Sequence, residues 1–162
     1  MRKLIVEHSA ACDAVGWIDV HTGLGPAGHG EKICGGQVYM AELDRARAWW
    51  GADVTSPLDG TTIASNVGGP ILDTLRAACP HAQVTALALE YGTLPLVAML
   101  NTLRADAWLR SHPQACQAMA IREQVRSTFC IDDPLWLGQI LGQARVAILQ
   151  AVAGLSRPRE SM

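Results

Sequence analysis

A short apolar segment, Gln83–Glu90, constrains the fold more than any other part of the chain. Its residues, QVTALALE, lie between Pro80 and the pair Tyr91–Gly92, which leaves too little length for a typical helix. Apolar side chains would occupy both faces of a strand formed here, which is typical of a strand inside a covered sheet. The sequence therefore predicts a buried strand with helices packed on its sheet, which is an α/β fold.

The other predicted elements are one further strand and five helices. Val15–His21 is short and contains Val, Ile and Trp, so it reads as a strand that runs into a glycine-rich loop, Thr22–Gly36. Apolar spacing and Pro or Gly boundaries predict helices at Tyr39–Trp50, Ile71–Cys79, Pro95–Ser111, Pro113–Phe129 and Asp133–Leu155. Two or three strands are few, since open sheets usually hold about four to six. We therefore expect a partial mixed sheet covered by helices, with a helix-rich C-terminal half.

The last predicted helix has clear signals at its start. Asp133 is suited to the N-cap and Pro134 to the first helical position. The helix then carries an apolar stripe formed by Leu137, Leu141, Ala144, Ile148 and Val152.

Length and charge limit the classes of function. A chain of 162 residues fits one domain, residues 1–162, with a sizeable core. Thirteen Lys and Arg against fifteen Asp and Glu give a net charge of -2, so the chain lacks the basic excess needed to bind nucleic acid. No apolar run approaches the roughly 18 residues of a membrane helix. We therefore expect neither nucleic acid nor a membrane as a partner.

Cysteine usage indicates the compartment. The five cysteines are odd in number, widely spaced and without a C-x-x-C pair, which is typical of free thiols. The apolar stretch near the start of the sequence is too short for a signal-peptide core. We therefore expect a cytoplasmic protein.

His21 is the first candidate site residue. It lies where the predicted strand ends, and the two-residue period of a strand places Asp19 on the same face. A neutral imidazole is a common metal ligand, and a nearby carboxylate can orient it. A single histidine at a strand end is also often structural, because metal sites are recognised by clusters of ligands. The residues alone leave both interpretations open.

Glu90 is the second and stronger candidate. Its carboxylate follows the apolar run VTALAL, so it is partly removed from water, an environment typical of a general base. The structural alternative is a carboxylate that caps the loop amides of Gly92 and Thr93.

A glycine motif suggests a rival function. Gly23–Gly28 formally matches G-x-G-x-x-G after a strand, and Glu42 or Asp44 stands near the distance expected for a ribose-binding acid. In a dinucleotide site, however, the glycines open a helix that holds the pyrophosphate. Here Pro26 and the later glycines favour a continuing loop, so dinucleotide binding is the weaker interpretation.

A more specific resemblance is carried by the segments WIDVHTGLGPAGHGE, WWGADV, TALALEYGTLP, LRADAWL and IDDPLWLGQILGQAR. Together they resemble an uncharacterised domain family of the zinc carboxypeptidase-like superfamily, which includes metallocarboxypeptidases and aspartoacylase-like enzymes. The resemblance covers about residues 13–155, and the D-x-H-T-G and A-L-x-E-x-G-T motifs stand in the order that the superfamily uses. It implies that this chain is the C-terminal half of such a fold.

The resemblance also implies roles for the candidate residues. The expected activity is zinc-dependent hydrolysis of a peptide or an acyl-amino-acid-like amide. His21 would be one zinc ligand, Glu90 the general base and Asp19 the carboxylate that orients His21. Because 69 residues separate positions 21 and 90, the site must be built by adjacent strands of one sheet.

Parts of the superfamily's site have no counterpart in this sequence. The other zinc ligands come from an upstream H-x-x-E motif, and none of the five histidines has a glutamate three residues later. Catalytic zinc normally takes three protein ligands, so we expect an N-terminal half of the fold to complete the site. A second interpretation is a non-catalytic interaction module or pseudoenzyme remnant, and a third is zinc held at a homodimer interface by His21, His29 and Glu31.

Overall fold

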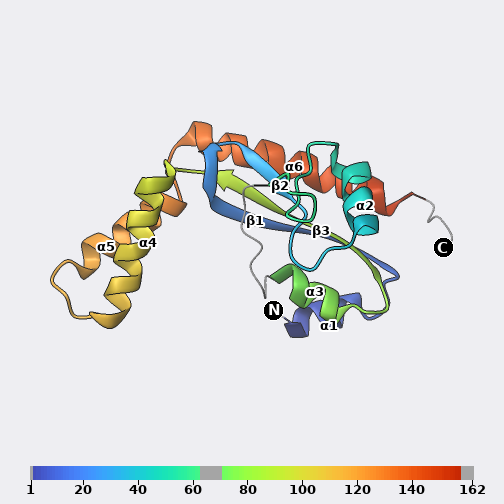
Figure 1. The fold of residues 1–162 in the computed structure, drawn as a ribbon, viewed down its shortest axis with the longest axis horizontal. Coiled ribbons are helices and arrows are strands. Elements are labelled where there is room, and N and C mark those ends of the chain that lie inside the picture. Colours follow the sequence, from blue (N-terminus) through green and yellow to red (C-terminus); the bar gives the residue numbers. More distant parts are fainter. Residues whose placement is uncertain (1, 63–70, 158–162) are drawn as a thin grey trace. The chain divides into compact units, whose positions relative to one another are not determined.

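A computed structural model describes residues 2–62 and 71–157 (Figure 1). Its three strands form one mixed sheet in the order β1-β3-β2. The elements follow one another as α1 (Arg2–Ser9), β1 (Ala14–Ala27), β2 (Gly30–Ile33), α2 (Met40–Trp50), α3 (Ile71–Ala78), β3 (Gln83–Gly92), α4 (Leu96–Ser111), α5 (Ala118–Phe129) and α6 (Pro134–Leu155). The predicted α/β class is confirmed.

The central strand β3 is the apolar segment that the sequence predicted. It continues two residues beyond Glu90 and ends at Gly92. Neighbouring residues that point to opposite faces, such as Ala86 and Leu87, are both fully buried. The prediction of a buried strand is therefore confirmed, and the burial of both faces explains its continuous apolar run.

The first strand, β1, continues through part of the predicted glycine-rich loop. It runs past His21 as far as Ala27, and the short strand β2 follows. Gly23 and Gly25 have φ angles of +151° and +102°, a backbone conformation that other residues rarely adopt. The prediction of a loop at this place was wrong because contacts between distant parts of the chain override the low strand preference of glycine.

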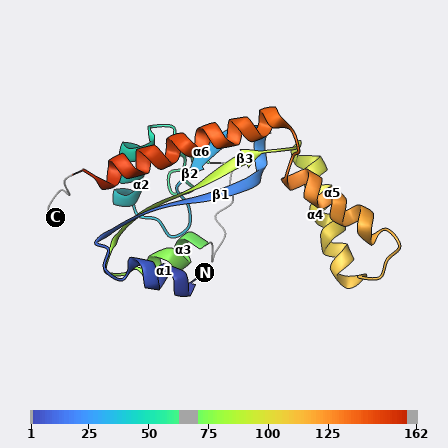
Figure 2. The same ribbon diagram turned by 180° about the vertical axis from the view of Figure 1, so that it is seen from behind.

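The chain divides into two compact units, and each is described by itself. The first unit comprises residues 1–19, 32–89 and 145–162, and the second comprises residues 20–31 and 90–144. In the first unit the sheet is covered on both faces, with α1 and α3 on one side and α2 and the end of α6 on the other (Figure 2).

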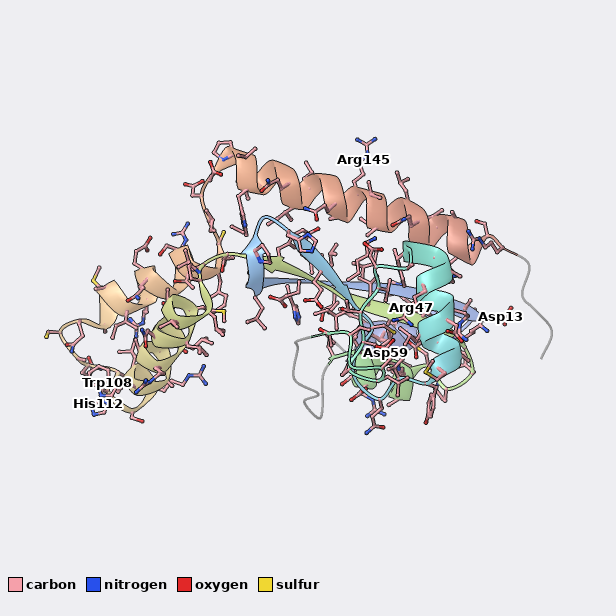
Figure 3. The ribbon with its side chains drawn as sticks, turned by 45° about the horizontal axis from the view of Figure 1, so that its top comes forward. Asp13, Arg47, Asp59, Trp108, His112 and Arg145 are labelled. Carbon is pink, nitrogen blue, oxygen red and sulfur yellow. The ribbon has the colours of Figure 1, made fainter. Side chains whose placement is uncertain are left out.

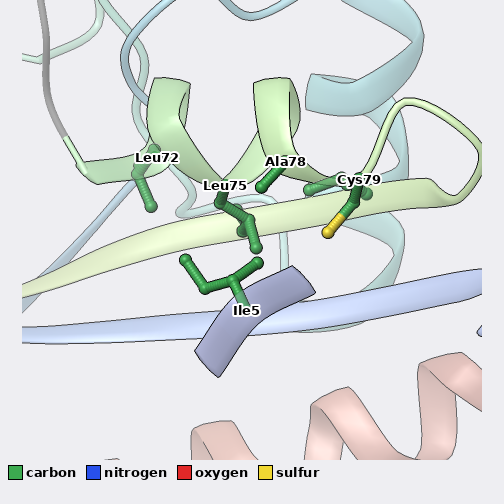
Figure 4. Close-up of a cluster of buried hydrophobic side chains, with 7 residues drawn as sticks. Ile5, Leu72, Leu75, Ala78 and Cys79 are labelled. Atoms are coloured by element: carbon green, nitrogen blue, oxygen red, sulfur yellow. The ribbon is translucent and has the colours of Figure 1, made fainter. Parts of the chain in front are cut away.

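The two faces of β1 in the first unit pack against different helices. Val15 and Trp17 contact a buried cluster that includes Ile5 of α1 and Leu75 of α3 (Figure 4). Gly16 lies between them in sequence and faces the opposite layer, where Trp49 and Leu155 would contact any side chain placed at this position. Because side chains alternate between the two faces of a strand, Val15 and Trp17 pack on the layer of α1 and α3, and Gly16 faces the layer of α2 and α6.

Polar contacts tie the helices of the first unit to the sheet. Arg76 of α3 donates to both carboxylate oxygens of Glu42 on α2, at 2.9 and 3.0 Å. Glu42 is only 5% exposed and also accepts the backbone N–H of Ala86 on β3. A second ion pair joins Arg47 to Asp59 in the loop after α2 (Figure 3). Because the Glu42 carboxylate accepts hydrogen bonds from Arg76 and from a backbone N–H, the cost of burying its charge is compensated.

The second unit contains an antiparallel hairpin formed by α4 and α5. Buried threonine hydroxyls of Thr102 and Thr128 lie 3.2 Å apart between the two helices. Near the tip, the Trp108 and His112 rings stack at a centroid distance of 4.3 Å (Figure 3). The helix predicted from Pro113 begins at Ala118, because the residues from His112 onward form turns that are hydrogen-bonded across three residues.

The helix α6 starts as the sequence predicted. The carboxylate of Asp133 accepts the backbone N–H of Trp136 at 2.9 Å, so Asp133 is the N-cap. The apolar stripe, in contrast, is exposed: Leu137, Leu141, Ile148 and Val152 are between 45% and 71% exposed.

The buried face of α6 is made of smaller residues and a tryptophan. Ala147 and Ala151 are buried, and the Ala147 carbonyl accepts the indole N–H of Trp50 at 2.9 Å. Small side chains allow the close approach of the helix to α2, so the larger aliphatic residues face outward. Among the residues described, no helix is both long enough and apolar enough to cross a bilayer.

Candidate active site

The two candidate residues meet in the second unit. His21 lies on β1 and Glu90 near the end of β3, which is the neighbouring strand in the sheet. The Nδ1 atom of His21 is 3.6 Å from Oε2 of Glu90. The Glu90 side chain is 13% exposed and the His21 side chain 53% exposed. A partly buried carboxylate therefore lies beside an imidazole that solvent can reach.

The second oxygen of Glu90 is held by the backbone of β1. Oε1 accepts the N–H of Leu24 at 2.9 Å, which fixes the carboxylate and leaves Oε2 toward His21. The expected structural alternative for Glu90 was a cap on the amides of Gly92 and Thr93. Those amides donate instead to the carbonyls of His29 and Gly23, at 3.1 and 3.3 Å. The capping interpretation was therefore wrong.

Gly23 makes room for the Glu90 carboxylate. A Cβ atom at this position would lie 3.1 Å from the Phe129 ring, 3.3 Å from the Met99 sulfur and 3.5 Å from Oε1 of Glu90. Together with the positive φ angle, these distances leave no space for a larger residue. Gly23 therefore lets two apolar side chains and the carboxylate approach the same stretch of backbone.

Two threonines fix the backbone around Gly23. Thr93 donates its hydroxyl to the Gly23 carbonyl at 3.2 Å, and its backbone N–H reaches the same oxygen. Thr22 donates its hydroxyl to the Phe129 carbonyl at 2.6 Å. These contacts link β1, β3 and the end of α5. Thr22, Thr93 and Phe129 were not predicted as supports, and the T-G dipeptide after His21 is the one local sequence signal of a constrained backbone.

The turn between β1 and β2 is closed by Gln143 of α6. Its amide nitrogen donates to the Gly28 carbonyl at 2.7 Å, and its amide oxygen accepts the Gly30 N–H at 3.0 Å. His29, between these two glycines, is exposed. The turn is therefore held by its backbone, while the His29 side chain faces solvent.

The end of β3 is anchored by two aromatic residues. Trp136 donates its indole N–H to the Gly92 carbonyl at 3.0 Å, and Tyr91 donates its hydroxyl to the Ile140 carbonyl at 3.1 Å. Burial raises the pKa of the Tyr91 hydroxyl to about 12. Tyr91 is therefore a neutral structural donor next in sequence to Glu90.

A family model described as a protein of unknown function, DUF2817, matches residues 1–143. The chain belongs to the DUF2817 family. The matched part of this DUF2817 chain contains both His21 and Glu90. It also contains Leu24, whose N–H is bound by the Glu90 carboxylate. Comparisons with curated proteins and with solved structures gave no match.

Within the described residues, the side chains that could bind a metal are too few for a complete zinc site. Among residues 2–62 and 71–157, no group of three or more His, Cys, Asp or Glu side chains is placed to hold a metal ion. His21 and Glu90 form a pair, whereas a catalytic zinc takes three protein ligands. The described residues alone therefore do not complete a catalytic zinc site.

Asp19 lies on β1 two residues before His21 and is half-buried. It belongs to the first unit, whereas His21 belongs to the second. Its role in orienting His21 stays a prediction.

The dinucleotide interpretation lacks its structural context. Gly23 and Gly25 lie inside β1, and Gly28 lies in the turn that Gln143 closes. The next helix, α2, begins only at Met40. Because the glycines do not open a helix, they cannot present a helix N-terminus to a pyrophosphate.

Proposed function

We propose that this chain contributes one part of a carboxypeptidase-like amidohydrolase site, with Glu90 as general base and His21 as one zinc ligand. The observation that carries the proposal is the 3.6 Å approach of His21 Nδ1 to Glu90 Oε2, while Leu24 holds the other carboxylate oxygen. Residues 69 positions apart are thus brought together with one acid oxygen directed at the imidazole. The resemblance of the D-x-H-T-G and A-L-x-E-x-G-T segments to the carboxypeptidase-like superfamily supports the same roles.

The part of the reaction assigned to Glu90 is proton transfer. Glu90 takes a proton from a water molecule as the water oxygen forms a bond to the amide carbon. It then gives that proton to the nitrogen as the C–N bond breaks and the amine leaves. A carboxylate that is 13% exposed and fixed by one backbone N–H is suited to this role, because it keeps its orientation between the two transfers.

His21 and further ligands from outside this copy of the chain would hold the metal. An imidazole is a common zinc ligand, and a carboxylate beside its ring can orient it. When bound, zinc would polarise the amide carbonyl and lower the pKa of bound water. We propose that the remaining ligands come from an N-terminal half of the fold or from a second copy of this chain.

The proposed substrate is a peptide or an acyl-amino-acid-like amide, as the superfamily resemblance implies. We propose the cytoplasm as its location, because all five cysteines are free thiols. Cys34 is not a competing nucleophile, since burial raises the pKa of its thiol to about 12.

A second candidate function is a non-catalytic interaction module. The exposed apolar stripe of α6 favours it, because Leu141 is 71% and Leu137 is 45% exposed. Contiguous exposed aliphatic residues often mark contact surfaces for other proteins. In this reading the His21–Glu90 pair is only structural.

A hydrolysis assay distinguishes the hydrolase from the interaction module. The tagged chain would be recovered from its native cells without chelator, together with bound partners, and tested on N-acetyl-amino acids and on peptides with a free C-terminus. Glu90→Gln should lower kcat at least about 100-fold, the usual contribution of a general base. His112→Ala, which removes an exposed histidine at the end of α4, is the matched control and should retain activity. Hydrolysis that is unchanged in Glu90→Gln, or no hydrolysis at all, would favour the interaction module.

A further inference from the structure

Within the first unit, the second half of helix α6 presents a face of exposed aliphatic side chains. The exposed fractions are 54% for Ile148, 60% for Leu149, 57% for Val152 and 42% for Leu155. The buried side of the same turns is formed by alanines, one of which lies against Trp50 of α2. An exposed aliphatic cluster of this kind commonly marks a contact surface for another molecule.

Arg145 lies at the start of this face and is the only charged residue among the 22 of α6. Its side chain is exposed and points away from the sheet (Figure 3). Within the described part of the chain, the Arg145 guanidinium has no ion-pair partner. Arg47, Arg76 and Arg110, in contrast, each pair with a carboxylate. Arg145 therefore brings an unpaired positive charge to an otherwise apolar face.

The end of α6 offers a complementary charge. The last four carbonyls of a helix have no partner inside it and give the C-terminus a partial negative charge. In α6 two of them accept the N–H groups of residues 156 and 157 and keep a second lone pair. The last turn of α6 holds no basic side chain. At another helix the chain makes such a contact, because Arg157 donates to the Ala48 carbonyl near the end of α2 at 3.0 Å.

The spacing of this face suits a second copy of the same helix. Arg145, Ile148, Val152 and Leu155 follow one another in steps of three, four and three residues, the spacing of paired helices. The steps read the same in both directions. Two copies of α6 can therefore lie antiparallel across a twofold axis, with Ile148 facing the partner's Val152. In that arrangement Arg145 lies beside the partner's Leu155 and the last carbonyls of that helix.

We propose that this face of α6 forms a homodimer by antiparallel pairing, in which Arg145 of each copy contacts the C-terminal carbonyls of the partner's α6. The charges decide for a second copy. Against an apolar partner of another kind, the Arg145 guanidinium would lose water without gaining an acceptor. All residues of the face belong to the first unit, so the proposal does not rest on the hydrolase site of His21 and Glu90.

Sedimentation velocity of the intact 162-residue chain tests the dimer. The face spans about three helical turns, which is less than the standard interface of about 800 Å² per partner. An interface of this size gives weak association, so we expect a reversible monomer–dimer equilibrium over about 5–500 μM chain.

Two matched valine variants locate the contact. Val152→Asp places a charge in the face without an acceptor and should raise the dimer Kd at least about tenfold. Val97→Asp is the matched control, because Val97 is 69% exposed on α4, and it should leave the Kd unchanged.

Charge variants at Ser156 test the antiparallel orientation. Ser156 follows α6 and is exposed, and antiparallel pairing places it beside the partner's Arg145. Ser156→Glu should lower the Kd about fivefold and Ser156→Lys should raise it about fivefold, since each change acts at two equivalent pairs. In an Arg145→Glu background this order should reverse.

Three outcomes would overturn the proposal. A chain that stays monomeric up to the highest concentration would mean that a different molecule covers the face. A dimer whose Kd is unchanged by Val152→Asp would use another surface. A dimer that responds equally to Ser156→Glu and Ser156→Lys would lack the contact with Arg145. If Val152→Asp fails to fold, Arg145→Glu alone gives the test, because Arg145 is exposed and should raise the Kd when reversed in charge.

Discussion

The Nδ1 atom of His21 lies 3.6 Å from Oε2 of Glu90, across two neighbouring strands. This contact gives little stability, because the His21 side chain is 53% exposed and water screens its charge. Glu90→Gln keeps an amide oxygen that can accept the Leu24 N–H. The free energy of unfolding, measured with urea, should therefore change by less than about 1 kcal/mol. A larger loss would mean that the carboxylate is mainly structural.

Gly23 should not tolerate a side chain. Its φ of +151° is unfavourable for other residues, and a Cβ would press on the Phe129 ring and the Met99 sulfur. Gly23→Ala should lower the free energy of unfolding by about 1–3 kcal/mol. Urea denaturation measures this, with Gly138→Ala as the control because its Cβ would meet open space. An unchanged midpoint in Gly23→Ala would contradict the close packing around Glu90.

Two glycines of α6 should respond in opposite directions to alanine. Gly142 is exposed and a Cβ there would meet nothing, so Gly142→Ala should stabilise the chain by about 0.5–1 kcal/mol. A Cβ at Gly154 would overlap the Trp49 indole, so Gly154→Ala should destabilise it. The thermal midpoints of the two variants should fall on either side of the wild type. Equal shifts would show that α6 does not pack closely on Trp49.

The raised pKa of Tyr91 should make the free energy of unfolding fall at alkaline pH. The unfolded phenol ionises near pH 10, whereas burial raises the pKa in the folded chain to about 12. Below pH 10 both states hold the proton, so the contribution is fully present. Between pH 10 and about 12 only the unfolded state releases the proton, so stability falls. The stability difference between wild type and Tyr91→Phe should therefore narrow from pH 9 to pH 11.5, and a constant difference would contradict the shift.

Local sequence signals predicted the elements that depend on periodicity and caps. The apolar run of β3 and the Asp133 cap of α6 were both found where the sequence placed them. The meeting of His21 and Glu90 agrees with the expectation of adjacent strands, since their separation excluded local geometry. Their catalytic roles stay proposals.

Features that depend on tertiary packing could not be predicted from the sequence. The glycine-rich second part of β1, residues 22–27, was predicted as a loop, because the residues that pack on it, such as Phe129 and Met99, are distant in sequence. In the first unit, Ile148 and Val152 of the stripe are exposed because Ala147 and Ala151 form the buried face of α6, where Trp50 donates to the Ala147 carbonyl. Helix α1 was not anticipated from the sequence, and of its eight residues only Ile5 and Ser9 are buried.

The most direct test of the central claim is a zinc titration of the chain, purified without chelator and followed by the imidazole resonances of its five histidines. If His21 is a zinc ligand, its resonances shift before those of the other four histidines. In His21→Ala this first binding phase should disappear, whereas His112→Ala should retain it. Zinc that perturbs other histidines first, or leaves His21 unchanged at saturation, would contradict the assignment of His21 as a zinc ligand beside Glu90.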